Sequence, residues 1–251
     1  IKISDEKVRC CGPKAIEDAQ KVCEKLNIPH YVMDFSSYLE EGVISKFIAE
    51  YLRGRTPNPC IDCNKFLKFG ILLEKAISSG FDFLATGHYA RIENFNGDFI
   101  LKKAKDKKND QSYFLYSIKK DNLKRILFPL GDFTKEEVRA LARKINLPVA
   151  EKPKSKDLCF IQDDYRKFIL KRIGKVKEGE ILDLKGNILG KHKGIFFYTV
   201  GQRERLGITS RKPLYVISIL PEKNQIIVGE KENLYAKGLF ANNLNFFVDK
   251  L

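Results

Sequence analysis

The stretch NKFLKFGILLEKAISSGFDFLAT, residues 64–86, decides the fold class. We expect a helix over residues 64–79, followed by a short strand over residues 81–86. The same order occurs upstream, where residues 13–26 carry apolar side chains at helical spacing and residues 28–35 predict a short buried strand. Helices that alternate with strands indicate an α/β domain built on a parallel sheet.

Turn residues between short apolar runs predict β-hairpins further along the chain. The paired runs are residues 89–92 with 98–101, 181–184 with 188–190, and 214–220 with 225–229. Between the first and second pairs, Thr134 and Glu137 have the spacing of a capping box, which predicts the start of a helix that stops near Pro148. After about residue 175 the sequence therefore has a β-rich character.

Charge and composition limit the classes of function. The chain has 251 residues, and 46 Lys and Arg against 32 Asp and Glu give a net charge of +14. No apolar run approaches the roughly 18 residues of a transmembrane helix, so no membrane association is expected. The positive charge favours a polyanionic partner, nucleic acid above all, and a merely basic protein is the alternative.

Six cysteines are too few for a disulfide scaffold, and no secretory signal pattern opens the chain, which predicts a cytoplasmic, reducing location. Cys60 and Cys63 form a CxxC pair at a predicted helix start, where the helix dipole favours a thiolate. This pair is compatible with redox chemistry, half a metal site or chance, and no second pair completes a zinc site. Cys159 is a third candidate, because Lys154 and Lys156 would favour its thiolate, although a core filler is the alternative.

Six sequence blocks occur in one order along the chain. They are RTPNPCIDCNK with KFG (55–65 and 68–70), ATGHYAR (85–91), DQSYFL (110–115), FPLG (128–131), SKDLCFI (155–161) and YTVGQR (198–203). Together they resemble the signature of the tRNA-specific 2-thiouridylases, the MnmA family. The resemblance implies a partial Rossmann-like domain of the adenine nucleotide alpha hydrolase or PP-loop type over residues 1–162. It also implies a central β-rich domain over 163–235 and the first part of a β-barrel over 236–251, with its first strand at 238–248.

The resemblance also implies a reaction. ATP, with Mg²⁺, adenylates the C2 carbonyl oxygen of the wobble uridine of certain tRNAs, and a persulfide sulfur then replaces that oxygen. Adenylation turns a poor leaving group into a good one, and a persulfide is a strong nucleophile at neutral pH. The implied partners are tRNA and a persulfide sulfur donor protein. We expect a monomer, although no motif specifies the oligomeric state.

The family's functional positions can be matched residue by residue. Cys159 matches the cysteine that carries the persulfide, and Cys63 matches the nucleophile that assists sulfur release, which implies a disulfide between them in at least one state. Gly87 matches an ATP contact, with a tight turn as the alternative reading. The positions that match contacts to the target base or the tRNA are Asn58, Pro59, Cys60, His88, Asn109, Asp110 and Gln111. Asp is common where this chain has Cys60, Lys is common where it has Asn109, and a lone histidine such as His88 is more often structural.

Two alternatives remain open at this stage. The family begins with an SGGxDS pyrophosphate loop, whose amides hold ATP phosphates, and these 251 residues contain no such segment. We therefore expect negligible ATP binding by these residues alone, and the second hypothesis is a catalytically incompetent tRNA-binding fragment. The third is an iron–sulfur-dependent variant, in which Cys60, Cys63 and Cys159 supply three thiolates to a [4Fe–4S] cluster.

Overall fold

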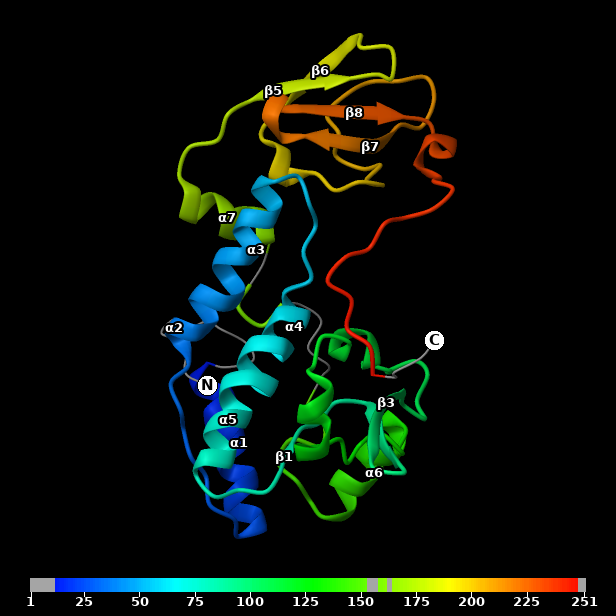
Figure 1. Ribbon diagram of the computed structural model, residues 1–251. Coiled ribbons are helices and arrows are strands. Elements are labelled where there is room, and N and C mark those ends of the chain that lie inside the picture. Colours follow the sequence, from blue (N-terminus) through cyan, green and yellow to red (C-terminus); the bar gives the residue numbers. More distant parts are fainter. Residues whose placement is uncertain (1–11, 153–157, 162–163, 248–251) are drawn as a thin grey trace. The chain divides into compact units, whose positions relative to one another are not determined.

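The computed structural model describes residues 12–152, 158–161 and 164–247 (Figure 1). The contacts between residues divide the chain into two compact units. The first unit contains residues 1–43, 59–162 and 243–251, and the second contains residues 44–58 and 163–242. The second unit therefore includes a segment from the N-terminal part of the sequence. The division into domains at residues 162 and 235 stays a prediction.

Helices α1 (Pro13–Leu26), α4 (Pro59–Asp62) and α5 (Leu73–Ser78) belong to the first unit. A π-helical segment, Cys63–Leu72, joins α4 to α5, so that one continuous helix runs from Pro59 to Ser78, drawn in cyan in Figure 1. Proline suits its first position because that residue's N–H has no partner within a helix. The predicted helix over residues 64–79 is thus confirmed, and it begins five residues earlier than expected.

The strand predicted for residues 28–35 is wrong. These residues have no regular secondary structure, and Ile28, Tyr31, Val32 and Met33 are largely exposed. A strand needs a neighbour for its backbone hydrogen bonds, and no strand within residues 12–152, 158–161 and 164–247 pairs with this run. An apolar run by itself therefore did not specify a strand.

The parallel sheet in the described part of the first unit consists of two short strands. Strand β1 (Leu84–Ala85) pairs in parallel with β4 (Ile126–Leu127), which confirms the second half of the strand predicted at residues 81–86. Strands β2 (Ala90–Phe95) and β3 (Asp98–Lys103) form the predicted antiparallel hairpin. Its turn residues, Asn96 and Gly97, have φ values of +52° and +93°, as an Asn-Gly hairpin turn requires.

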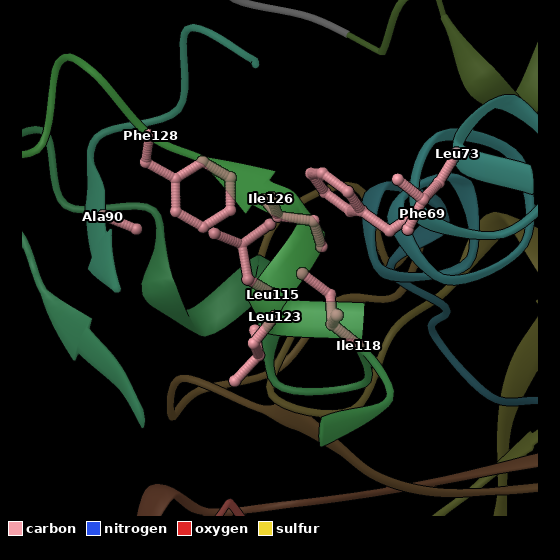
Figure 2. Packing of buried hydrophobic residues seen from close by; sticks show 8 residues of the cluster. All are labelled: Phe69, Leu73, Ala90, Leu115, Ile118, Leu123, Ile126 and Phe128. Atoms are coloured by element: carbon pink, nitrogen blue, oxygen red, sulfur yellow. The ribbon is translucent and has the colours of Figure 1, made fainter. Parts of the chain in front are cut away.

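The core of the first unit lies between the long helix and these strands (Figure 2). Phe69 and Leu73 come from the helix, Ala90 from β2, and Ile126 from β4, with Phe128 directly after β4. Leu115, Ile118 and Leu123 complete the cluster from the segments between β3 and β4. These residues hold the long helix against the segments around β4, and Leu84 of β1 packs on the same cluster.

Helix α6 (Lys135–Lys144) begins with the predicted capping box. The Thr134 hydroxyl accepts a hydrogen bond from the Glu137 N–H at 3.2 Å, and the Glu137 carboxylate accepts one from the Thr134 N–H at 2.6 Å. Both groups would otherwise be without a partner at the helix start.

The second unit combines two helices with a four-stranded sheet. The helices are α3 (Ser45–Leu52) and α7 (Tyr165–Ile173). The short helix α2 (Ser36–Leu39) belongs to the first unit, and the π-helical segment Glu40–Ile44, which precedes α3 in the chain, ends at the first residue of the second unit. The strands β5 (Gly179–Leu182), β6 (Ile188–His192), β7 (Tyr215–Leu220) and β8 (Gln225–Gly229) lie in the order β6-β5-β8-β7. Both hairpins predicted here are confirmed, and β5 and β8 pair in parallel.

The barrel strand expected at residues 238–248 is wrong for residues 238–247, which contain no strand. Residue 248 lies outside the described residues. The Asn245 amide instead donates hydrogen bonds to the carbonyl oxygens of Tyr116 (2.7 Å) and Ile118 (2.8 Å), and Phe247 packs on the core of the first unit. These contacts hold the segment as a loop.

None of the helices in the described ranges has both the length and the apolar character needed to cross a membrane.

Candidate functional site

The CxxC pair lies at the start of the long helix, as predicted. Cys60 is exposed in the first turn, and Cys63 is half-buried and begins the π-helical segment. A π-helical segment widens the helical turn and is frequently found at functional sites. The sequence did not predict this distortion, which sets the direction in which Cys63 and its neighbours project.

Asn64, next to Cys63, connects the helix to the block at residues 110–115. Its side chain is 2% exposed, and its amide nitrogen donates a hydrogen bond to the Phe114 carbonyl oxygen at 2.9 Å. Its amide oxygen has no hydrogen-bond partner among the described residues. Asn64 is thus positioned beside a candidate nucleophile by a hydrogen bond to a residue fifty positions away.

Cys159 is half-buried and is followed by two buried residues, Phe160 and Ile161. It belongs to the same unit as Cys63. Lys154 and Lys156, the predicted sources of positive charge near its thiol, lie outside the described residues. The disulfide between Cys63 and Cys159 stays a prediction.

Gly87 lies just beyond the carboxyl end of β1, the edge at which parallel sheets of this class bind ligands. It is exposed, and a Cβ added to it would lie 3.6 Å from Leu130 Cδ1, which is ordinary van der Waals contact. The chain's own packing therefore does not require a glycine here. The ATP contact at Gly87 stays a prediction.

His88 is buried at 8% exposure between aromatic rings. Its ring centroid lies 5.8 Å from those of both Phe69 and Phe128, and its Nδ1 is hydrogen-bonded to the Thr86 hydroxyl at 2.7 Å. Burial, assisted by the charge of Lys68, lowers the pKa of His88 to about 3. The imidazole is therefore neutral at physiological pH. Its burial and its neutral state favour the alternative interpretation of His88 as a structural residue. A tRNA contact by His88 stays a prediction.

The predicted tRNA-contacting tripeptide is bound into its own loop. The Asn109 amide donates to the Asp106 carboxylate at 2.8 Å, and the Asp110 carboxylate accepts from the Ala104 N–H at 2.7 Å. Gln111 holds Tyr89 through two hydrogen bonds, in which its side-chain oxygen accepts from the Tyr89 N–H and its own N–H donates to the Tyr89 carbonyl oxygen. The tripeptide therefore positions the segment after Gly87, and its contacts to tRNA stay predictions.

The predicted base-contacting segment crosses the boundary between the units. Asn58 belongs to the second unit, whereas Pro59 and Cys60 belong to the first. Pro59 is buried and Cys60 is exposed. A contact between Asn58, Pro59 or Cys60 and a target base stays a prediction.

The three candidate iron–sulfur ligands do not form a ligand set. Cys60, Cys63 and Cys159 all lie in the described ranges, where no group of three or more His, Cys, Asp or Glu side chains is arranged to hold a metal ion. A cluster would require these thiolates to move together, so the iron–sulfur hypothesis gains no support from the geometry.

Comparison with known proteins gives a consistent assignment. Residues 2–163 match a family model described as the tRNA methyl transferase HUP domain, and residues 166–230 match the tRNA methyl transferase PRC-barrel domain. The tRNA-specific 2-thiouridylase MnmA 1 of Syntrophus aciditrophicus (strain SB) is 56% identical over 247 residues, which are 98% of this chain and 66% of the relative. The chain belongs to the MnmA family of tRNA-specific 2-thiouridylases.

Two further MnmA relatives show the same extent of similarity. The tRNA-specific 2-thiouridylase MnmA of Carboxydothermus hydrogenoformans is 49% identical over 97% of this chain and 68% of its own length. MnmA 1 of Caldanaerobacter subterraneus subsp. tengcongensis is 52% identical over 100% of this chain and 70% of its own length. The chain thus spans about two thirds of the length of the curated relatives it matches. The HUP match and the parallel pair β1–β4 together confirm the predicted Rossmann-like α/β class.

Besides the π-helical segment, Asn64 and Gly131 are residues that the sequence analysis did not single out. Both stand inside the quoted blocks, yet neither carries ionisable or nucleophilic chemistry. A polar residue at an inward-facing helical position could have indicated Asn64. Nothing in the sequence distinguishes Gly131, at which an added Cβ would overlap the Ala90 carbonyl oxygen, from a glycine in an ordinary turn.

Proposed function

We propose that the protein carrying this chain is a tRNA-uridine 2-sulfurtransferase that makes 2-thiouridine at the wobble position. The observation that carries the proposal is 46–56% identity to proteins named tRNA-specific 2-thiouridylases, over nearly all of this chain. The cysteines at positions 63 and 159 give it chemical support, because sulfur transfer needs thiols and methyl transfer, the chemistry in the family model's description, does not. The proposed co-substrate is ATP with Mg²⁺.

The proposed chemistry has two stages. In the first, the uridine O2 attacks the α-phosphorus of ATP, which forms the adenylated base and releases pyrophosphate. In the second, the terminal sulfur of a persulfide on Cys159 attacks C2, and AMP leaves with the former carbonyl oxygen. The transferred sulfur is then bonded to both C2 of the base and Cys159 Sγ. Cys63 attacks Cys159 Sγ and breaks the bond between that atom and the transferred sulfur, so a Cys63–Cys159 disulfide forms and 2-thiouridine is released. An external thiol reductant returns both cysteines to the reduced state.

Three further assignments belong to this proposal. The persulfide reaches Cys159 from a sulfur donor protein, the substrate is tRNA, and the protein works as a monomer in the cytoplasm, where tRNA and ATP are present. The net charge of +14 supports binding to a polyanion. Gly87, at the carboxyl end of β1, is the proposed nucleotide contact, and Asn58, Pro59, Cys60, His88, Asn109, Asp110 and Gln111 are the proposed positions around the base and the tRNA.

A reconstituted thiolation assay tests the proposal. The intact protein is incubated with unmodified tRNA, ATP, Mg²⁺ and a persulfide donor, and 2-thiouridine is quantified together with AMP and pyrophosphate. We expect Cys159→Ala to abolish 2-thiouridine while pyrophosphate release continues. The matched control is Cys23→Ala, a half-buried cysteine in α1 outside the quoted blocks, which should retain full activity. A Cys159→Ala protein that still makes 2-thiouridine would contradict the assigned role.

The iron–sulfur alternative has a separate test at Cys60. If Cys60 only shapes the base pocket, Cys60→Asp should retain thiolation, because Asp occurs at this position in relatives. If Cys60 were a cluster ligand, anaerobically purified protein would contain iron and Cys60→Ser would lose it. We expect full activity without stoichiometric iron in the starting protein, and an iron content that follows activity across the Cys60 variants would overturn that expectation.

A further inference from the structure

Arg205 has a backbone conformation that arginine rarely adopts. Its φ is +59°, in the left-handed region. The other non-glycine residues with positive φ in the described ranges are all asparagines: Asn27, Asn96, Asn146, Asn224 and Asn243. Asparagine tolerates this region because its short amide can hydrogen-bond locally, whereas arginine gains no such compensation. The arginine therefore stands where glycine or asparagine would be less strained.

The segment around Arg205 is firmly held on its N-terminal side. The Gly201 N–H donates to the Val216 carbonyl oxygen at 2.8 Å, and the Val216 N–H donates to the Gln202 carbonyl oxygen at 2.9 Å. The Gln202 side chain spans the turn, because its oxygen accepts from the Thr199 N–H and its nitrogen donates to the Glu204 carbonyl oxygen. These bonds fix the approach to Arg205 on strand β7.

The C-terminal side of the segment is held by packing. Leu206 is 6% exposed and belongs to the core of the second unit, together with Val216. Ile208 packs on β6 so closely that a Cβ added to Gly190 would lie 2.8 Å from its Cγ2. With Leu206 directed into the core, the left-handed turn at Arg205 leaves the arginine side chain exposed.

Arg203 and Arg205 are both exposed and stand on either side of the exposed Glu204 in this segment, which we call the arginine loop (residues 203–205). No side-chain hydrogen bond or ion pair joins either guanidinium to another residue in the part of the chain that the structure describes, although Lys212 nearby pairs with Glu230 at 2.8 Å. Because the backbone of this segment is already fixed, an anion that binds here orders the arginine side chain but does not also have to order the backbone. The planar fork of arginine matches a phosphate group.

We propose that the arginine loop binds the phosphate backbone of the tRNA substrate, with Arg205 as the principal contact. This inference rests on the proposed function, because it needs an RNA substrate. The contact orients the RNA and reads no sequence, since it is made to phosphate.

The test measures stability and RNA affinity on the same variants. Arg205→Gly removes the guanidinium and relieves the left-handed strain, so its melting temperature should equal or exceed that of the parent. Its affinity for unmodified tRNA should fall about tenfold, and the slope of log K against log salt should fall by about one. Arg205→Lys keeps the charge and should retain the parental slope. Arg211→Gly removes an equal charge from an exposed position in the same unit and should change the affinity much less.

The outcomes separate this inference from the proposed function. If the parent protein binds no tRNA, the proposed function fails and the arginine loop fails with it. If the parent binds tRNA in a salt-dependent way but Arg205→Gly binds equally well, the arginine loop alone is overturned. Equal losses of tRNA affinity in Arg205→Gly and Arg211→Gly would mean that only the net charge matters, and this result would also overturn the role of the arginine loop.

Discussion

Gly87 and Gly131 make a matched pair for testing why each residue is a glycine. An added methyl group would make only ordinary contact with Leu130 at Gly87, but it would overlap the Ala90 carbonyl oxygen at Gly131. We expect Gly87→Ala to change the free energy of unfolding by less than about 0.5 kcal/mol, and Gly131→Ala to lower it by about 1–3 kcal/mol or more. Urea unfolding of the two variants measures the difference.

The same pair tests the nucleotide contact in the intact protein. Gly87→Ala should weaken ATP binding measured by calorimetry, because the new methyl group stands where the nucleotide approaches the backbone. Unchanged ATP affinity in a well-folded Gly87→Ala protein would remove Gly87 from the nucleotide site. A strongly destabilised Gly87→Ala protein would instead support the reading of Gly87 as a turn glycine.

Because His88 is buried, we expect the stability of the protein to fall as the pH is lowered. Burial lowers the pKa of His88 from 6.5 to about 3. The stability that the neutral, buried imidazole contributes to the folded state is therefore fully present above pH 6.5 and is lost as the pH falls toward 3. Between pH 7 and pH 5 we expect His88 to reduce the free energy of unfolding by about 2 kcal/mol. His192, whose pKa is also lowered by burial, contributes with the same sign.

A substitution isolates the histidine's share of this effect. His88→Gln should show a smaller loss of stability than the parent protein between pH 7 and pH 5, measured by urea unfolding at both values. An identical pH dependence in both proteins would mean that His88 titrates normally, and it would contradict the buried, neutral imidazole between Phe69 and Phe128.

At the scale of elements, the capping box of α6 gives a direct test of local sequence control. Thr134→Ala removes the side-chain acceptor for the Glu137 N–H and should lower the free energy of unfolding by about 1 kcal/mol. Thr134→Ser keeps the hydroxyl and should remain close to the parent. If both variants unfold alike in urea, the cap contributes nothing to stability.

Elements specified by local chemistry were predictable from the sequence, and those that depend on distant partners were not. The α6 cap and the Asn96–Gly97 turn follow from side chains within four residues of one another. The run at residues 28–35 has strand-forming side chains but no pairing partner in the described ranges. The placement of the Asn64 side chain is equally non-local, because its amide bonds to Phe114, fifty residues away.

The candidate site divides in the same way. Cys63 and Cys159 could be found because their side chains are reactive and stand in recognisable blocks. The positioning contacts could not be found, since the bonds from Gln111 to Tyr89 and from Asn64 to Phe114 depend on how distant segments pack. Sequence reasoning therefore identified reactive groups better than the residues that hold them.

At the scale of the whole molecule, the proposed function assigns a different step of sulfur transfer to each of two cysteines. In the proposed function Cys159 carries the transferable sulfur, and Cys63, at the start of the π-helical segment, releases it. We propose that the net charge of +14 and the arginine loop act earlier, when the RNA binds. Each cysteine should therefore fail at a different stage when it is replaced, although both replacements prevent product formation.

The most direct test is mass spectrometry of the sulfur on each cysteine after loading by a persulfide donor, together with quantification of 2-thiouridine. In the Cys63→Ala protein we predict a persulfide on Cys159 and no 2-thiouridine. In the Cys159→Ala protein we predict no persulfide on Cys63 and no 2-thiouridine, while Cys60→Ala should still load Cys159. A persulfide found on Cys63, or 2-thiouridine formed without Cys159, would contradict the account.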